Sequence, residues 1–329
     1  MATYKGIQGY SVQKLSSDPT ASESAGQLWY NSSTGKFKIS VAGAGAWASA
    51  TALNTKHTTA GGAGTVTAAL VASGDSSPTV ATVNSETYNG STWTEVNNVL
   101  TARRYIGATG TSTACLMAGG QTFAPAYVDV SETYNGTSWT EGNDLVTAGR
   151  TGNGFVGITT AALTFGRYAG SITDINETYD GTSWTETADL QTARRSMASA
   201  GTQAAALCVA GNSGSPTNIV ETWDGTSWSE GNDLNTNRQS PNGKGTATNA
   251  IIFGGENPGG SLTETETYDG TSWTEVGDMA VSSYAMAAAG VNSTAALACG
   301  GYEGAPQAST LLVEEWVDPV YTIKTVTVS

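Results

Sequence analysis

The apolar residues of the chain occur in short runs that are separated by clusters of Gly, Asn, Ser and Thr. Residues 112–120, STACLMAGG, form one apolar run that ends in two glycines. Residues 127–134, YVDVSETY, alternate as a strand with one buried face does. Asn135-Gly136 then indicates a hairpin, because both central residues of a two-residue turn need positive φ. With residues 103–109 before these runs and a strand starting near Trp139 after them, this stretch predicts four antiparallel strands and no helix.

One phrase recurs along the chain. ETYNGSTW ends at Trp93, and related phrases end at Trp139, Trp184, Trp228 and Trp273. Subtracting successive Trp numbers gives 46, 45, 44 and 45 residues. A period of about 40–50 residues is that of a four-stranded propeller blade. The sequence therefore predicts a ring of repeated blades.

The number of repeats predicts six blades. The Glu-x-aromatic strand occurs six times, ending at Tyr88, Tyr134, Tyr179, Trp223, Tyr268 and Trp316. A Trp strand also occurs six times if Trp47 is counted, although Trp47 precedes the first Glu-x-aromatic strand and Trp316 has no Trp strand after it. We therefore expect Ala46–Leu53 to be the fourth strand of the last blade, beside Leu311–Trp316. Such closure removes exposed strand edges.

Residues 46–318 resemble the kelch repeat: an apolar strand ending in Gly-Gly, a Tyr, a turn, a Trp seven residues after the Glu, and an Arg before the next unit. Gly119-Gly120, Gly254-Gly255 and Gly300-Gly301 keep the glycine pair, whereas the other units depart from it. The resemblance implies an all-β, six-bladed kelch-like β-propeller with four antiparallel strands per blade, closed by the N-terminal strand. The repeated aromatic rings are expected to pack between blades.

Residues 1–45 lie outside the repeat. Residues 26–40 predict a β-hairpin, which cannot bury its apolar side chains alone. The segments 7–19, IQGYSVQKLSSDP, and 26–38, GQLWYNSSTGKFK, resemble the start of tailed-phage virion proteins. That resemblance implies an arm that attaches the chain to a virion. The attachment residues it suggests are Leu28, Trp29, Tyr30, Phe37 and Ile39.

The C-terminal run, residues 319–329, alternates apolar and polar residues. It is either an exposed strand available to a partner or the finish of the last blade. The N-terminal residues lack the apolar core of a secretory signal, and no apolar stretch reaches the ~20 residues of a membrane span. We expect synthesis in a host cytoplasm, release by lysis and a place in the virion.

The charge balance argues against two classes of partner. The chain has 28 acidic and 14 basic residues, a formal charge of −14. Nucleic-acid binding needs a basic patch, and no Lys/Arg cluster longer than a pair occurs. Anionic membrane surfaces are disfavoured for the same reason. We therefore expect no nucleic-acid partner and no membrane insertion.

The residues that metal or covalent chemistry needs are scarce. Cys115, Cys208 and Cys299 have no CxxC spacing and lie in apolar runs, so buried free thiols are expected. The single histidine, His57, falls at the repeat position of Arg103 and cannot build a copper site alone. We expect no metal, no cofactor and no enzyme activity. A glycan-cleaving enzyme that uses paired carboxylates is a distant alternative, for which the loop acids Asp174, Glu256 and Glu264 are the only candidates outside repeated positions.

The arginines that precede each unit are the candidate ligand-binding residues. They are Arg103, Arg150, Arg194 and Arg238, with Arg104 and Arg195 as neighbours. A partial ring of guanidinium groups at one mouth of the channel could clamp a carboxylate or sulfate. The alternative is a structural role, in which each Arg bonds carbonyls at the blade ends or acidic neighbours such as Asp144, Asp189 and Asp233.

Six variable loops occupy the same place in each repeat, so we expect them to cluster on one face. They are residues 75–80, 121–126, 168–172, 212–217, 257–262 and 302–308. Variable loops on a rigid frame are where recognition usually resides. The expected function is a virion fibre, appendage or decoration protein whose loops contact a host surface glycan or a neighbouring virion protein, as a monomer or a homo-oligomer. A cellular kelch-type interaction adaptor is the alternative.

Overall fold

A computed structural model describes residues 12–20, 24, 26–77, 80–123, 126–147, 152–304 and 308–327. Every regular element in these residues is a β-strand, so the all-β prediction is confirmed. The described residues contain no helix that could cross a membrane. The chain divides into two compact units: a smaller one, Met1–Ala46 with Asp318–Ser329, and a larger one, Trp47–Val317.

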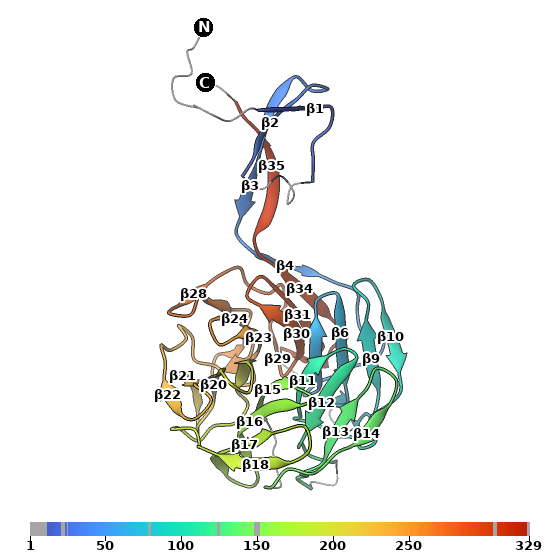
Figure 1. The fold of residues 1–329 in the computed structure, drawn as a ribbon, viewed down its shortest axis with the longest axis vertical. Coiled ribbons are helices and arrows are strands. Elements are labelled where there is room, and N and C mark those ends of the chain that lie inside the picture. The colour runs from blue at the N-terminus through green and yellow to red at the C-terminus, as the bar shows by residue number, and fades with distance from the viewer. Residues whose placement is uncertain are drawn as a thin grey trace. The chain divides into compact units, whose positions relative to one another are not determined.

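The larger unit contains six four-stranded sheets (Figure 1), in each of which the strands pair antiparallel wherever a register is resolved. The first three sheets consist of β5 (Gly61–Thr65), β6 (Ala68–Ala72), β9 (Ser85–Tyr88) and β10 (Trp93–Val96); β11 (Gly107–Thr111), β12 (Ala114–Ala118), β13 (Ser131–Tyr134) and β14 (Trp139–Glu141); and β15 (Gly154–Ile158), β16 (Ala161–Tyr168), β17 (Ile172–Tyr179) and β18 (Trp184–Thr187). The last three consist of β19 (Ala198–Gly201), β20 (Ala206–Asn212), β21 (Pro216–Trp223) and β22 (Trp228–Glu230); β23 (Asn242–Thr246), β24 (Asn249–Phe253), β27 (Thr265–Tyr268) and β28 (Trp273–Glu275); and β30 (Ala287–Asn292), β31 (Ala295–Cys299), β34 (Val313–Val317) and β4 (Ala46–Ser49).

The first strands of successive sheets are neighbours, which gives a propeller-like arrangement. β5 lies beside β11 and also beside β30, and each of β11, β15, β19 and β23 lies beside the first strand of the next sheet. Small residues make this approach possible. A Cβ added to Gly62 of β5 would lie 2.5 Å from the carbonyl oxygen of Ala288 in β30, so only glycine fits there.

The N-terminal strand lies where the repeat count placed it. β4 is the fourth strand of the sheet that contains β34. The amide of Ala50 donates to the carbonyl of Val313 at 2.8 Å, and that of Leu53 donates to Leu311 at 3.0 Å. The predicted pairing of Ala46–Leu53 with Leu311–Trp316 is confirmed.

The repeated aromatic residues form one ring pair in each sheet. Trp47 and Trp316 have centroids 5.8 Å apart, so the pair built from the two ends of the repeat region matches the pairs built within one repeat. The other five pairs, with centroids 4.8 to 5.4 Å apart, are Tyr88–Trp93, Tyr134–Trp139, Tyr179–Trp184, Trp223–Trp228 and Tyr268–Trp273. These rings are largely buried among the apolar residues of the sheets, where they supply much of the apolar area that folding removes from water.

The hairpin at Asn135-Gly136 is confirmed, but its predicted turn type is wrong. Tyr134 pairs directly with Trp139, so four residues connect the strands instead of two. Only Gly136 has positive φ, at 90°. Asn135 instead accepts hydrogen bonds on Oδ1 from the amides of Thr137 and Ser138, both at 2.9 Å. A carboxylate can accept the same two bonds, and Asp replaces Asn in later repeats. There the two equivalent amides of the turn lower the pKa of Asp180 and Asp269. At Asp224 the Thr226 hydroxyl and the two amides lower the pKa to about 2.

Three small sheets involve the loops between the second and third strands of the first, fifth and sixth sheets. They are β7 (Asp75–Ser77) with β8 (Val80–Ala81), β25 (Glu256–Asn257) with β26 (Gly260–Ser261), and β29 (Ser283–Tyr284) with β32 (Tyr302–Glu303) and β33 (Ala308–Ser309). The first two are hairpins within their loops, whereas β29 belongs to the segment before β30, and its pairing with β32 holds the start of the third loop against that segment.

The smaller unit contains a single four-stranded sheet in the order β1-β2-β3-β35. Its strands are β1 (Gln13–Leu15), β2 (Leu28–Asn31), β3 (Lys36–Gly43) and β35 (Val320–Thr325). The predicted hairpin is therefore confirmed as β2 and β3. The C-terminal run is not the finish of the last blade, because it pairs along β3 as the edge strand of this sheet. A two-stranded hairpin is only marginally stable, and the added strands give it the partners it needs.

Candidate functional site

The predicted ligand-binding arginines have identical buried surroundings. Arg103, Arg194 and Arg238 are each 0 % exposed. In Arg103, Nη1 donates to the carbonyls of Gly119 at 2.8 Å and Val130 at 2.7 Å, and Nη2 contacts Oε1 of Glu132 at 2.8 Å. The same three contacts recur in Arg194, with Ala210, Ile219 and Glu221, and in Arg238, with Gly254, Glu264 and Glu266.

The acidic partner is the repeated Glu of the ETY phrase. Each of these glutamates also accepts two backbone amides from the segment that enters its sheet. For Glu132 they are the amides of Leu100 and Thr101, at 2.7 and 3.2 Å. The same arrangement is found at Glu86, Glu177, Glu221, Glu266 and Glu314. The expectation that Asp144, Asp189 and Asp233 pair with the arginines is therefore wrong, and the Oδ1 atoms of Asp189 and Asp233 accept backbone amides instead.

His57 takes the arginine position in the first sheet, as its place in the repeat predicted. Its side chain is 0 % exposed, with Nδ1 2.7 Å from the carbonyl of Ser73 and Nε2 3.4 Å from Oε1 of Glu86. In the sixth sheet Ser283 occupies this position. Arg150 lies outside the described residues. The contacts of Arg103, Arg194 and Arg238 match the structural alternative, and they leave no exposed guanidinium group for a ligand.

The second residue after each of these positions lies at the same end of the unit. We call this end the mouth and define it by Thr59, Tyr105, Gly152, Ser196, Ser240 and Ala285. Five backbone hydrogen bonds of 2.5 to 3.0 Å link these six residues in series: Thr59 to Ala285, Ala285 to Ser240, Ser240 to Ser196, Ser196 to Gly152, and Gly152 to Tyr105. The five members other than Gly152 have different side chains, but all five have φ between 51° and 55°. The mouth is therefore a stiff backbone rim.

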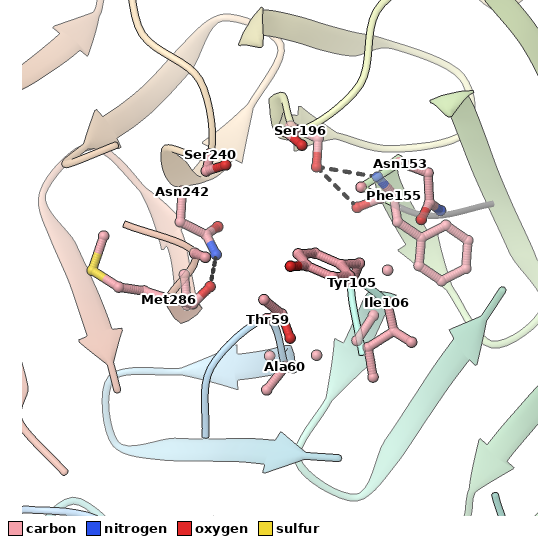
Figure 2. Close-up of a pocket in the computed structure, with 18 of the residues that line it drawn as sticks. Thr59, Ala60, Tyr105, Ile106, Asn153, Phe155, Ser196, Ser240, Asn242 and Met286 are labelled. Atoms are coloured by element: carbon pink, nitrogen blue, oxygen red, sulfur yellow. Dashed lines mark hydrogen bonds between the residues drawn. The ribbon is translucent and has the colours of Figure 1, made fainter. Parts of the chain in front are cut away.

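Figure 2 shows Thr59, Tyr105, Ser196 and Ser240 around an opening, with the Tyr105 ring extending toward its middle. Below the rim lies a cavity of about 110 Å³ that is lined by first strands of all six sheets. Gly62, Ala108, Phe155, Ser199, Lys244 and Ala288 contribute to it. We call it the axial cavity.

Beside the rim lies a second hollow of about 250 Å³, which we call the mouth pocket. Arg195 lies over the ring of Tyr168, with its guanidinium carbon 4.5 Å from the centroid. Tyr127 meets Tyr168 edge to face, with centroids 6.0 Å apart. Gln239 donates from Nε2 to Oε1 of Glu256 at 2.9 Å. The pocket therefore combines aromatic faces, a cation, amides and a carboxylate. They come from the rim, from the residues just before it, and from the ends of the second strands and the loops that follow them.

Arg195 differs from its neighbour Arg194 in having no ion pair within the described part of the chain. Its guanidinium group rests on an aromatic ring and lines the mouth pocket. A guanidinium group that lies over an aromatic face still has N–H donors at its edge, and a carboxylate or hydroxyl can accept them. Arg195 is thus the arginine of this set that is placed to meet a ligand.

A second polar cluster at the mouth surrounds Asp75. This carboxyl is 0 % exposed, and burial raises its pKa to about 6 despite Arg104, whose Nη1 lies 3.9 Å away. Thr59 donates to Asp75 Oδ2 at 3.4 Å. The hydroxyl of Tyr284 is buried without a hydrogen-bond partner among the described residues, and its ring lies 5.4 Å from that of Tyr302. This cluster contains titratable groups, and its Thr59 also lines the axial cavity.

Sequence reasoning named the loops but missed Tyr127, Tyr168 and Gln239 as site residues. The signal that could have found them is variation between repeats. The position after the buried cation carries Thr58, Arg104, Arg195, Gln239 and Tyr284, and each pairs with the start of a variable loop at Asp75, Gln121, Asn212, Glu256 and Tyr302. This position carries four residue types in the five repeats just named, so the repeated fold does not require a particular side chain there.

The attachment residues predicted in the arm lie on two faces of its sheet. Trp29 is 2 % exposed, and its Nε1 donates to Oδ1 of Asp18 at 3.0 Å, so it is buried within the smaller unit. Leu28 pairs with Ile39 and Tyr30 with Phe37 on the opposite face. There Leu28 is 36 % and Phe37 46 % exposed. Four of the five residues therefore share one apolar face, which we call the arm face.

The described residues contain no group of three or more His, Cys, Asp or Glu side chains that could hold a metal ion. All three cysteines are buried free thiols, as predicted, and burial raises the pKa of Cys115 and Cys208 to about 12. Comparison of the chain with protein-family models and with curated proteins finds no match.

Proposed function

We propose that this chain is a six-bladed kelch-like β-propeller that acts as a non-enzymatic binding protein of a phage virion. The six four-stranded sheets, the neighbouring first strands and the place of β4 support the six-bladed ring. The six glutamates that hold the entering segments support it independently, because the same contact recurs once in every sheet. A ring of this kind is a rigid frame for variable loops.

The mouth pocket is the observation that carries the binding function. Tyrosine rings offer apolar faces to the C–H surface of a sugar, amides and carboxylates bond its hydroxyls, and Arg195 can bond a carboxylate with two N–H groups. The pocket places all of these groups within one hollow of about 250 Å³. The ligand class that fits is a glycan, and an acidic sugar such as a uronate would use Arg195 best.

The arm face supports attachment to a particle. It carries the exposed apolar residues Leu28 and Phe37 on a sheet that is complete without the larger unit. The sequence of the smaller unit contains five lysines and three acidic residues, a net charge of +2. This leaves nine basic and 25 acidic residues, a net charge of −16, in the larger unit. The two units thus have charges suited to different partners.

Two variants test the two roles separately. Tyr168→Ala should lower the affinity for an acidic oligosaccharide at least about tenfold, because the sugar loses the aromatic ring on which it would stack and Arg195 loses the ring on which it rests. Phe37→Ala should leave that affinity unchanged and reduce the number of copies retained on purified particles. Binding is measured by calorimetry with uronate-containing oligosaccharides, and retention by quantitative immunoblotting of particles assembled with each variant.

Each role has its own contradicting outcome. Equal affinity of Tyr168→Ala and the parent protein would exclude the mouth pocket as the glycan site. Equal retention of Phe37→Ala would exclude the arm face as the attachment surface. Release of shorter sugars from the oligosaccharide by the parent protein would replace the binding function with a glycan-cleaving enzyme.

A further inference from the structure

Lys244 is an exception among the innermost residues of the larger unit. Each first strand has a glycine with positive φ near its end, and the residue before that glycine is uncharged in the other five sheets. Those five residues are Ala63, Thr109, Val156, Ala200 and Ala289. Only β23 places a lysine here. Since the repeated fold is built five times without a charge at this position, the fold itself does not require Lys244.

The side chain of Lys244 extends between two cavities. It lines the axial cavity and also a larger cavity of about 260 Å³ that includes Thr65, Thr109 and Val291. Phe155 and Ser199 line both cavities as well. The ammonium group donates to the carbonyl of Gly62 in β5 at 3.1 Å, so it reaches from the fifth sheet to the first.

The charge of Lys244 has no partner of opposite sign among the described residues. None of the ion pairs found there includes it. The repeated glutamates accept backbone amides, and four of them also lie beside an Arg or His side chain. Burial lowers the pKa of Lys244 to about 8, and the only titratable groups that oppose this effect are the thiols of Cys115 and Cys299. Burial raises the pKa of both thiols, so they stay neutral at pH 6 and do not balance the charge.

Lys244 is half-buried, and its ammonium group lies beside the two cavities without a partner of opposite charge. A charge that is partly removed from water in this way is costly, so proteins normally pair it or neutralise it. An ammonium group has three N–H donors, and the Gly62 carbonyl uses one of them. The cavities on either side are large enough for small molecules, since a water molecule takes about 30 Å³ of liquid volume. The space and the remaining donors are what an anion site needs.

We propose that Lys244 binds a small, singly charged anion, such as a halide or a short carboxylate, in the cavities at the centre of the larger unit. One ammonium group balances one negative charge. Sulfate and phosphate would keep a second charge uncompensated beside Phe155 and Ala288, which argues against them. Monovalent anions lose less hydration on entering such a site.

Bromide is the probe for the first experiment, because its anomalous scattering identifies it directly. Crystals of the full chain at pH 6 should show a bromide peak within hydrogen-bonding distance of Lys244 Nζ. The peak should be absent in Lys244→Met, which keeps the length of the side chain but not the charge. Lys56→Met, at an exposed lysine of the same unit, should retain it. No peak at Lys244, or an equal peak in Lys244→Met, overturns the proposal.

A second measurement needs no substitution and therefore does not depend on whether the variant folds. An anion that binds only the protonated lysine raises its pKa, by about one unit at an anion concentration ten times Kd. The pKa of Lys244 is followed by NMR of the side chain in bromide and in sulfate at equal ionic strength. The expected result is a rise in bromide and little change in sulfate, whereas a pKa that is the same in both salts excludes the site.

Discussion

Arg194 and Arg195 are neighbours in the sequence, but their side chains have different surroundings. Arg194 is 0 % exposed and bonds two carbonyls and Glu221. Arg195 rests on Tyr168 and lines the mouth pocket. The first position is an Arg or His in every described repeat but the sixth, whereas the second changes from repeat to repeat. The comparison teaches that in this molecule repetition marks the buried structural layer, whereas variation marks residues that line the mouth pocket.

The buried layer is constant because its groups depend on each other. A buried carboxylate is tolerated when it is hydrogen-bonded and paired. Each repeated Glu accepts two backbone amides, and Glu132, Glu221 and Glu266 are also paired with an arginine. The two amides that it accepts belong to the segment entering the sheet from the preceding repeat. The layer therefore joins successive sheets, and a change in one of its members disturbs both.

The largest expected effect is the loss of one of these glutamates. Glu221→Ala leaves the Arg194 guanidinium buried without its carboxylate and removes the acceptor of the Gln191 and Thr192 amides. Breaking a buried pair in this way costs about 3–5 kcal/mol. The free energy of unfolding is measured by urea denaturation. Glu230→Ala is the matched control on the exposed face of the neighbouring strand, and a cost as small as that of the control contradicts a structural layer.

The second-largest effect concerns β4, the N-terminal strand that pairs with β34. In Trp47→Ala the ring contacts with Phe253, at 4.8 Å, and with Trp316 are lost, together with the hydrogen bond from Nε1 to Thr265 Oγ1. Because the ring is only partly buried, we expect a cost of about 2–3 kcal/mol, below that of a fully buried Trp. Thermal and urea unfolding measure it. An unchanged melting temperature would mean that β4 adds nothing to its sheet.

The contrast between constant and variable positions also explains what the sequence could predict. The period, the six aromatic pairs and the pairing of β4 with β34 follow from residues that recur, so counting them was enough. The interior role of Arg194 was predicted only as one of two alternatives, because an arginine reads the same in sequence whether it is buried or exposed. The mouth pocket could not be predicted, since Tyr127, Tyr168 and Gln239 meet through loops whose paths no repeated residue determines.

The arm shows the same limit in another form. The alternation in residues 26–40 predicts a hairpin, and β2 and β3 confirm it. Which face is covered depends on Asp18, whose carboxylate accepts hydrogen bonds from Trp29 and Asn31, and on the pairing of β35. Both partners are distant in sequence from the hairpin. Strand alternation alone left the two faces equivalent, so the candidate attachment residues included Trp29, which is buried within the smaller unit.

A smaller effect on stability is expected at Asp75, at the start of a variable loop, and this effect depends on pH. Burial raises the pKa of Asp75 from 3.8 to about 6. Between pH 4 and pH 6 the carboxyl is therefore protonated in the folded protein and ionised in the unfolded chain. Stability from this group is therefore greatest below pH 4 and falls as pH rises toward 6. Two pKa units correspond to about 3 kcal/mol. Asp75→Asn removes this loss, and the hydrogen bonds it weakens reduce the gain to about 1–2 kcal/mol.

The measurement is the free energy of unfolding of Asp75→Asn and the parent protein from pH 4 to pH 8. The variant should gain relative to the parent as pH rises through about 5 and 6, with no further change above pH 7. Asp278→Asn, at an exposed-loop acid with no buried partner described, controls for the loss of one negative charge. A difference between Asp75→Asn and the parent that does not vary with pH would show that Asp75 titrates normally.

The smallest expected effect on stability is that of Arg195→Gln, and it tests the comparison most directly. The side chain has no ion pair in the described part of the chain, so its loss should change the free energy of unfolding by no more than about 0.5 kcal/mol. Arg194→Gln, one residue earlier, should cost several times more, since Glu221 would stay buried without its cation. The same two variants should also differ in binding. The affinity for a uronate-containing oligosaccharide should fall in Arg195→Gln, whereas the folded fraction of Arg194→Gln should bind as the parent protein does. If instead both variants lose stability equally, the two positions belong to one structural layer, and variation between repeats is no guide to the binding surface.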